Sequence, residues 1–301
     1  MDINDHLLFS FSALSPVERG AGENPFNTNV ETSKISDQQS RQTTQPPLDQ
    51  EQPFVSPTDL RKLPAHIHPN SKEVYPMFSK PRGIALIINI KIKEEEKGQL
   101  VNRLGSDKDI EMLEKLFGAL DFEVKIKRNL KQEEIYNVLH NISCEDHSNY
   151  DCFVLCLMSY SLDGFVYGAD GERVFLDTVR NLFSNSRCST LKGKPKLFVI
   201  QANRNNGVVN GNPQIIPNEA DMLMAYSTVS GHVSFRNLHY GSHFIRCLVE
   251  VFREKAGHED VLSMLTMVSD SISSMGEEVY FKQVGQPTST LTKKLFFWPG
   301  L

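Results

Sequence analysis

Short apolar runs recur along the chain from residue 83 onward, and several of them end abruptly in polar residues. The runs are Gly83–Asn89, Cys152–Met158, Leu197–Ile200 and Met222–Thr228. A continuous apolar run of this length is typical of a strand that is buried on both faces. A fifth segment, Phe122–Lys127, alternates between apolar and charged residues and is typical of a strand nearer the edge of a sheet.

The segments between these strands carry apolar residues at helical spacing. Helices are predicted over about 106–120, 131–143, 174–183, 241–256 and 258–275. Ser106 is the predicted N-cap of the first helix, and Asp107 and Asp109 lie in its first turn. Residues 91–98 are predicted as a polar loop and 164–171 as a small hairpin. This alternation of strand and helix predicts an α/β domain with a mostly parallel sheet, whose strands share one carboxyl edge.

The first part of the chain differs in composition. Residues 1–73 are rich in Ser, Thr, Gln, Pro and Asn, and we expect this arm to be largely disordered because it offers little apolar surface to bury. Its apolar cluster, Leu7 to Leu14, is either a docking patch or a chance grouping, and chance is favoured. We expect the folded region to begin near Val74.

Charge and cysteine content narrow the function classes. The chain has 301 residues and a net charge of -5, which argues against binding nucleic acid or anionic membranes. Its five cysteines are an odd number and indicate reduced thiols in a cytoplasmic protein. The apolar cluster at Leu7 follows acidic residues, so a signal peptide is not expected, and no run reaches membrane-spanning length. No metal or cofactor motif is recognised.

Two motifs resemble the catalytic segments of caspases. Gln201–Asn205 resembles the caspase signature Gln-Ala-Cys-(Arg/Gln/Gly)-Gly, with Asn203 at the cysteine position. Leu157–Ser161 is similar to the caspase Leu-Ser-His-Gly segment, with Tyr160 at the histidine and Ser161 at the oxyanion glycine. The resemblance implies a caspase-like fold, with a central sheet of about six strands flanked by helices on both faces. It also suggests an inactive homologue, a pseudocaspase of the decoy kind found in insects.

These substitutions remove the chemistry of a cysteine protease. The amide of Asn203 cannot attack a carbonyl carbon as a thiolate does, and Tyr160, with an ordinary pKa of about 10, is a poor base at neutral pH. Ser159, Ser161 and His232 are conceivable replacements. A nucleophile also needs a positioned base, so we expect these three residues to be structural and the chain not to be an enzyme.

The resemblance also implies a retained specificity pocket. It maps the two arginines and the glutamine that hold an aspartate side chain in caspases onto Arg103, Gln201 and Arg236. Guanidinium groups suit a carboxylate both in geometry and in charge. Each arginine alone would be read as an ordinary exposed loop residue, but the three matches in order favour a pocket.

The resemblance further divides the folded region. Residues 74–204 correspond to the large caspase subunit, 218–301 to the small subunit, and 205–217 to the connector that is cut after aspartate in caspases. No aspartate occurs between Thr178 and Ala220, so we expect an uncut chain.

The end of the chain resembles the strand at the caspase dimer edge. Residues 289–298 are predicted to form this strand, although packing within the chain's own sheet is equally favoured. The interface residues implied are Leu291, Thr292, Lys293, Leu295 and Phe297.

Three functions are open at this point. The favoured one is regulation of an active caspase in apoptosis by heterodimerisation, with enhancement favoured over inhibition. A homodimer is an open alternative. The alternative is a binding module that captures aspartate-containing peptides or caspase inhibitors in the pocket. Residual cysteine-type endopeptidase activity is the least favoured.

Overall fold

The structure is a computed structural model that describes residues 53–64, 67–94, 100–162, 164–202, 220–230, 232, 234–274 and 283–301. Three predictions lie outside the described residues: the arm up to residue 52, the position of Asn203, and the connector over 205–217. The predicted boundaries between large-subunit-like and small-subunit-like regions therefore stay predictions.

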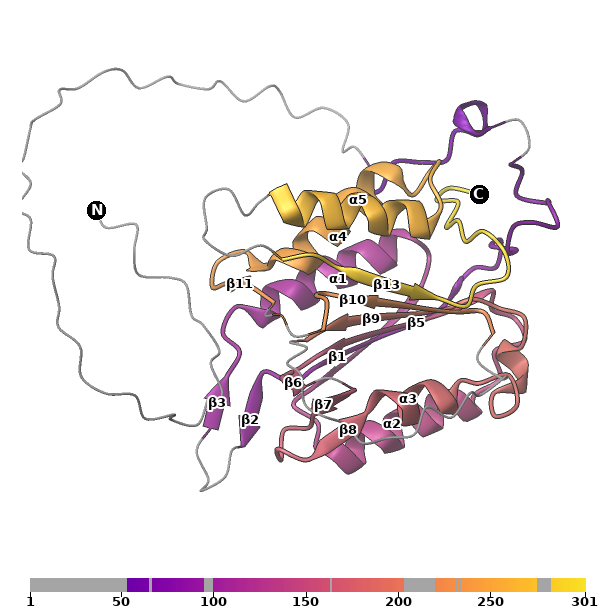
Figure 1. Cartoon of the computed structure of the whole chain (residues 1–301). Helices are drawn as coiled ribbons and strands as arrows, with labels where there is room; N and C mark the ends of the chain where they lie inside the picture. Colours follow the sequence, from indigo (N-terminus) through magenta and orange to yellow (C-terminus); the bar gives the residue numbers. More distant parts are fainter. Residues whose placement is uncertain are drawn as a thin grey trace, which may run out of the picture. The chain divides into compact units, whose positions relative to one another are not determined.

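A six-stranded sheet forms the centre of the fold, in the order β13-β10-β9-β5-β1-β4 (Figure 1). All neighbouring strands are parallel except β13, which runs antiparallel to β10. This sheet confirms the predicted α/β class. The strands are β1 (Gly83–Asn89), β4 (Glu123–Arg128), β5 (Cys152–Met158), β9 (Lys196–Gln201), β10 (Met222–Tyr226) and β13 (Gln286–Ser289).

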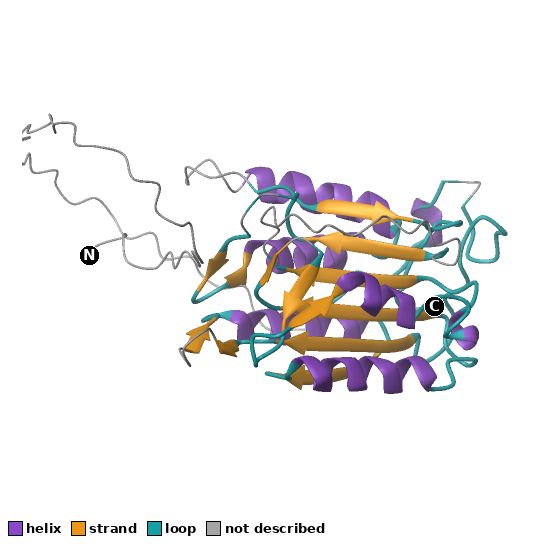
Figure 2. Ribbon diagram, turned by 60° about the horizontal axis from the view of Figure 1, so that its bottom comes forward, coloured by secondary structure: helices purple, strands orange, loops and turns teal. Residues whose placement is uncertain are grey.

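Helices cover both faces of the sheet, as predicted (Figures 1 and 2). One face carries α1 (Ser106–Ala119), α4 (His243–Lys255) and α5 (Val261–Ser274), and the other carries α2 (Gln132–Cys144) and α3 (Leu176–Leu182). Alternate residues of β1 pack into the two cores, Ala85 and Ile87 into one and Ile84 and Leu86 into the other. Burial on both faces is the reason that this strand is apolar from Ile84 to Ile88, and Asn89 at its end is the one buried polar residue in it. None of the described helices has the length and apolar character needed to cross a membrane.

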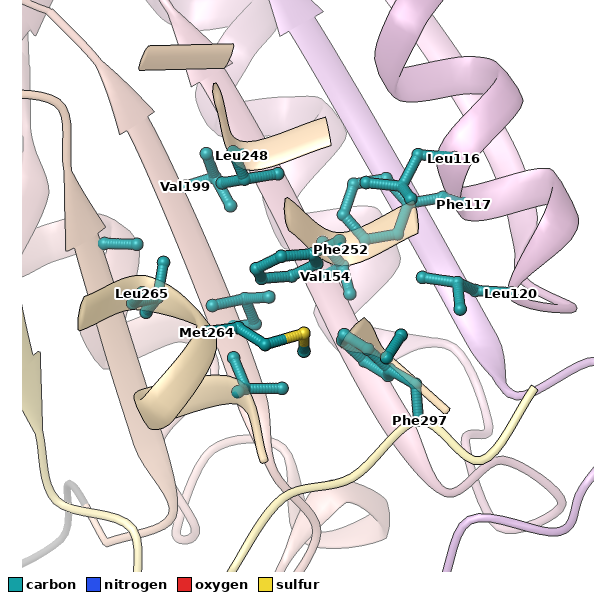
Figure 3. Packing of buried hydrophobic residues seen from close by; sticks show 14 of the residues in the cluster. Leu116, Phe117, Leu120, Val154, Val199, Leu248, Phe252, Met264, Leu265 and Phe297 are labelled. Atoms are coloured by element: carbon teal, nitrogen blue, oxygen red, sulfur yellow. The ribbon is translucent and has the colours of Figure 1, made fainter. Parts of the chain in front are cut away.

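The core beneath α1, α4 and α5 is shown in Figure 3. Phe117 and Phe252 project from α1 and α4 towards Val154 and Val199 of the sheet. Phe297 packs against Phe252, with ring centroids 6.0 Å apart. The carboxyl-terminal segment is therefore part of this core.

The carboxyl-terminal segment differs from the strand predicted for it. The prediction of a strand over 289–298 is wrong. The strand β13 ends at Ser289, and the described residues after it make only one isolated bridge, from Lys294 to Val74. Leu295 and Phe297 are 1% and 0% exposed, since their apolar side chains cover the chain's own core. These two residues offer no surface to a dimer partner. Leu291 is half-buried, and Thr292 and Lys293 are exposed.

Several smaller elements differ from the predictions. The polar loop at 91–98 begins with a strand of a two-stranded sheet, β2 (Ile92–Glu94) with β3 (Leu100–Asn102). The hairpin after β5 is a three-stranded sheet, which includes Val174 and delays the third helix to Leu176. Its strands are β6 (Ser161–Leu162), β7 (Phe165–Tyr167) and β8 (Arg173–Phe175). A last pair, β11 (Arg236–Asn237) and β12 (Gly241–Ser242), precedes α4.

The folded domain also begins earlier than residue 74. Val55 and Ile67 are 3% and 4% exposed and belong to the core on the α4 side. The polar composition of the arm hid these two apolar anchors, so disorder is the wrong description for the described residues between 53 and 73.

Candidate functional site

The candidate site lies at the carboxyl edge of the parallel strands. Asn89, Met158 and Gln201 are paired neighbours at the ends of β1, β5 and β9. The Ser159 amide donates to the Gln201 carbonyl oxygen at 3.3 Å, so Tyr160 follows the end of β5 directly beside the end of β9. This edge is where ligands of open α/β sheets bind.

Arg103 is held at this edge from β3. Its backbone amide donates to the Lys91 carbonyl at 2.7 Å, and its Nη1 donates to Asn89 Oδ1 at 3.0 Å and to the Ile90 carbonyl at 3.2 Å. The residue is 3% exposed, and its Nη2 is buried without a hydrogen-bond partner in the described part of the chain. One donor of a buried guanidinium is thus left to a ligand, because an unpaired buried donor is otherwise costly.

The start of α1 is built around the same asparagine. Asn89 Nδ2 donates to Ser106 Oγ at 3.0 Å. The predicted N-cap role of Ser106 is wrong, because Gly105 caps the helix with a φ of 82°. A Cβ on Gly105 would lie 2.6 Å from the Asn237 carbonyl, so glycine permits the close approach of α1 to β11.

Asp109 connects α1 to Arg236. Its Oδ1 accepts from the Ser242 amide at 2.7 Å, and its Oδ2 lies 4.0 Å from Arg236 Nε. The carboxylate is 0% exposed, and a Cβ on Gly241 would lie 2.3 Å from it. From the sequence, Asp109 was predicted only to lie in the first helical turn. Its spacing of four residues from the buried Leu113 was the signal that it faces inward.

Charge interactions among Arg103, Arg236 and Asp109 shift their pKa values. Burial and the nearby positive charge of Arg236 hold the pKa of Arg103 well below its usual value. Burial also lowers the pKa of Arg236 and raises the pKa of Asp109, against the opposing attraction between these two side chains. Two guanidinium groups and one carboxylate leave one positive charge when all are ionised. Such a site suits one further carboxylate.

Gln201 is tied to the segment that carries Arg236. Its Nε2 donates to Ser234 Oγ at 2.7 Å, and Gln283 Nε2 donates to the same oxygen at 3.2 Å. Gln283 Oε1 accepts from the Phe235 amide at 2.9 Å. The structure therefore brings Arg103, Gln201 and Arg236 to one edge. Gln283 was not predicted from the sequence because no local motif marks it.

Tyr160 forms an aromatic wall beside Arg103. The Arg103 guanidinium carbon lies 5.9 Å from the ring centroid, and the ammonium of Lys93 lies 5.3 Å from it. Lys93 is 8% exposed and also lies 4.4 Å from the ring centroid of Tyr167. Cation–π contacts of this kind stabilise the packed ring, which gives Tyr160 a structural role.

Ser159, Ser161 and His232 were the conceivable replacements for the catalytic residues. Ser159 Oγ donates to the Tyr167 carbonyl at 2.6 Å, and Ser161 is buried in β6. His232 is exposed and its Nδ1 lies 3.1 Å from the Ser230 carbonyl. The Ser159 hydroxyl and the His232 imidazole are thus each directed at a backbone carbonyl, and not at each other.

The chain is similar in sequence to known proteins. A family model described as "Caspase domain" matches residues 82–296. The chain is 36% identical to caspase-8 of Mus musculus over 257 residues, which is 76% of this chain and 54% of caspase-8. It is 35% identical to caspase-3 of Bos taurus over 244 residues, which is 75% of this chain and 88% of caspase-3. The chain thus spans about half the length of the caspase-8 proteins it matches. These matches show that the chain belongs to the caspase family.

Proposed function

We propose that the chain is a non-catalytic caspase homologue that regulates an active caspase by forming a heterodimer with it. The observation that carries the proposal is the sequence itself, with tyrosine and asparagine where the base and the nucleophile are required. The cytoplasm and apoptosis are the setting that we propose for this activity.

The position of β13 at the edge of the described sheet supports dimerisation. Among the described strands, β13 pairs on one side only, with β10. Its residues Pro287, Thr288 and Ser289 are exposed. An uncovered edge has backbone groups that a second chain can pair with, although Pro287 removes one donor. We therefore place the contact on β13 and the adjoining Leu291, Thr292 and Lys293.

Enhancement is the favoured direction of regulation. An active caspase needs support for its active-site loops from a neighbouring subunit, and a well-folded partner without catalytic groups supplies that support. A partner that forms nonproductive dimers would instead lower the activity.

Co-purification tests the heterodimer. We expect the chain to co-purify with an active caspase and to raise its cleavage of an aspartyl peptide. Thr288→Glu should abolish both effects by placing a charge on the edge strand. Lys127→Glu, which changes an exposed residue of the opposite edge strand β4, is the matched control and should retain them. Equal behaviour of the two variants would refute the assignment to β13.

Catalysis by the chain alone is tested in the same assay. We expect no turnover of aspartyl peptides by the purified chain. Hydrolysis that disappears in Arg103→Met would show endopeptidase activity and overturn the non-catalytic proposal.

A second function, capture of aspartate-containing peptides or caspase inhibitors, is favoured by one observation. The buried Nη2 of Arg103 has no hydrogen-bond partner in the described residues, and Arg236 lies near enough to lower the pKa of Arg103. We expect a labelled tetrapeptide ending in aspartate to bind, and its asparagine counterpart to bind at least about tenfold more weakly, because a charged group is left unpaired. Arg236→Glu should abolish capture and leave a β13-mediated effect intact. If Arg236→Glu binds the peptide as the natural chain does, the pocket is not the capture site.

A further inference from the structure

A second hollow lies on the helical face, away from β13. It is a groove of about 310 Å³ between α1 and α4, which pack against each other. The segment around Phe54 closes one part of it, and the turn at His239 and Tyr240 closes another. We call it the α1–α4 groove. That turn joins β11 to β12, so the groove borders the hairpin that carries Arg236.

Apolar side chains are exposed to this groove. Met112 of α1 and Val249 of α4 line it together with the rings of Phe54 and Tyr240. Tyr240 is 64% exposed, the largest exposed fraction among the large hydrophobic residues described. Tyrosine presents a wide, rigid contact surface and is enriched at the centres of protein interfaces. A cavity of this size lies at the lower end of the range for ligand pockets and has room for a bulky side chain.

The charge of the groove is basic, although the whole chain has a net charge of -5. Four cationic side chains and two glutamates line it. Both glutamates already have partners, Glu111 with Lys108 at 3.0 Å and Glu250 with Arg246 at 2.9 Å. The other two cations, Lys115 and Arg253, have no acidic partner within ion-pair distance in the described residues.

Arg253 is also fixed in place. Its Nε donates to the Phe54 carbonyl at 3.0 Å, and its guanidinium carbon lies 4.5 Å from the centroid of the Phe54 ring. A guanidinium held in this way loses little further freedom when it binds a carboxylate. Lys115 is exposed and lies on the α1 side of the groove.

We propose that the α1–α4 groove binds a short acidic segment of a partner protein. One bulky apolar side chain of that segment rests between Phe54 and Tyr240, over Met112, and its flanking carboxylates bind Lys115 and Arg253. The two glutamates of the groove repel a continuous row of phosphates, so a peptide with separated charges fits better than nucleic acid.

Fluorescence anisotropy with labelled peptides tests this proposal on the full chain. The probe is Glu-Glu-Phe-Glu-Glu, and the comparison peptides are Glu-Glu-Gly-Glu-Glu and Lys-Lys-Phe-Lys-Lys. We expect the probe to bind with a dissociation constant of roughly 10 to 100 μM, and about tenfold more tightly than either comparison peptide. Raising the salt from about 50 to about 300 mM should weaken binding, because exposed charges are screened.

Two groove variants and two matched controls locate the contact. Tyr240→Ala should weaken binding about tenfold, and Lys115→Glu about fivefold, since each removes an exposed contact. The controls are Phe175→Ala, which truncates an aromatic residue that is 42% exposed, and Lys192→Glu, which reverses an exposed lysine. Both lie away from the groove and should bind the probe as the natural chain does. Circular dichroism should show all four variants folded.

Three results would overturn the proposal. The first is absence of probe binding, and the second is equal loss in groove and control variants. The third is a combined result: the probe does not bind, the natural chain self-associates, and Tyr240→Ala abolishes this self-association. The groove would then hold a second copy of the chain. The outcome is independent of the proposed heterodimer, because Thr288→Glu should leave probe binding unchanged.

Discussion

Charged side chains are buried at both ends of the parallel sheet, but the two ends differ in how far the chain itself supplies hydrogen-bond partners for them. At the amino end, Arg82 Nη2 donates to the Trp298 and Leu301 carbonyls at 3.1 and 2.8 Å, and Nη1 donates to the Met77 carbonyl. Lys196 Nζ donates to Asn185 Oδ1 at 3.1 Å. The chain itself supplies the partners of these groups.

The carboxyl end leaves more of its polar atoms unpaired. The buried polar atoms at this end that have no hydrogen bond within the described residues include Arg103 Nη2, Gln201 Oε1, Asp109 Oδ2 and Arg236 Nε. Around Arg82 at the amino end, the corresponding unpaired atoms are Arg82 Nε and Trp298 Nε1. Buried charge that is satisfied within the chain stabilises a fold. Buried charge left unpaired lowers stability and is retained where a ligand completes it.

The largest loss of stability is expected from truncating an aromatic residue in the core beside the amino end of the sheet. Phe297→Ala should lower the free energy of unfolding by about 3–5 kcal/mol, because it empties a fully buried space against Phe122 and Phe252. Urea denaturation measures the loss. Phe175→Ala, at an exposed ring, should change stability by less than about 0.5 kcal/mol. A similar loss in both variants would contradict the placement of Phe297 in the core.

Neutralising one arginine at each end tests the comparison directly. Arg82→Met should cost about 3 kcal/mol in urea denaturation, because it leaves several buried carbonyls without donors. Arg236→Met should cost less than about 1 kcal/mol, since the lost attraction to Asp109 is offset by relief of the repulsion on Arg103. The same variant should lose binding of the aspartate tetrapeptide. Equal stability losses would remove the distinction between the two ends.

The smallest effect is a pH dependence at Asp109. Its pKa is raised in the folded state, so on acidification the folded chain takes up this proton before the unfolded chain does. Asp109 therefore contributes a stability that increases as the pH falls from neutral through its raised pKa and that is absent at higher pH. Asp109→Asn should remove this contribution, and Asp107→Asn, in the same helical turn, should retain it. Denaturation curves of the three proteins between neutral and acidic pH measure the difference, and a natural chain with the same pH slope as Asp109→Asn would refute the assignment.

The sequence alone was sufficient for the central strands. A strand buried on both faces is mostly apolar, so the central residues of β1, β5 and β9 were visible as uninterrupted runs, and buried polar residues occur only at the ends of β1 and β9. The assignment of Tyr160 and Asn203 to the catalytic positions of caspases stays a prediction from the resemblance, and position 203 lies outside the described residues. Apolar character did not distinguish a strand from a packed coil, which is why 289–298 was mistaken for an edge strand.

The tertiary structure decided how distant segments meet. Asp109 binds the Ser242 amide across 133 residues, Gln283 reaches Ser234 across 49, and Phe54 lines a groove with Tyr240. Periodicity reports which face of an element is buried, but not what lies against that face. The physical reason is that such contacts depend on the packing of whole helices and strands, so the partners of the pocket and of the α1–α4 groove emerged only from the folded chain.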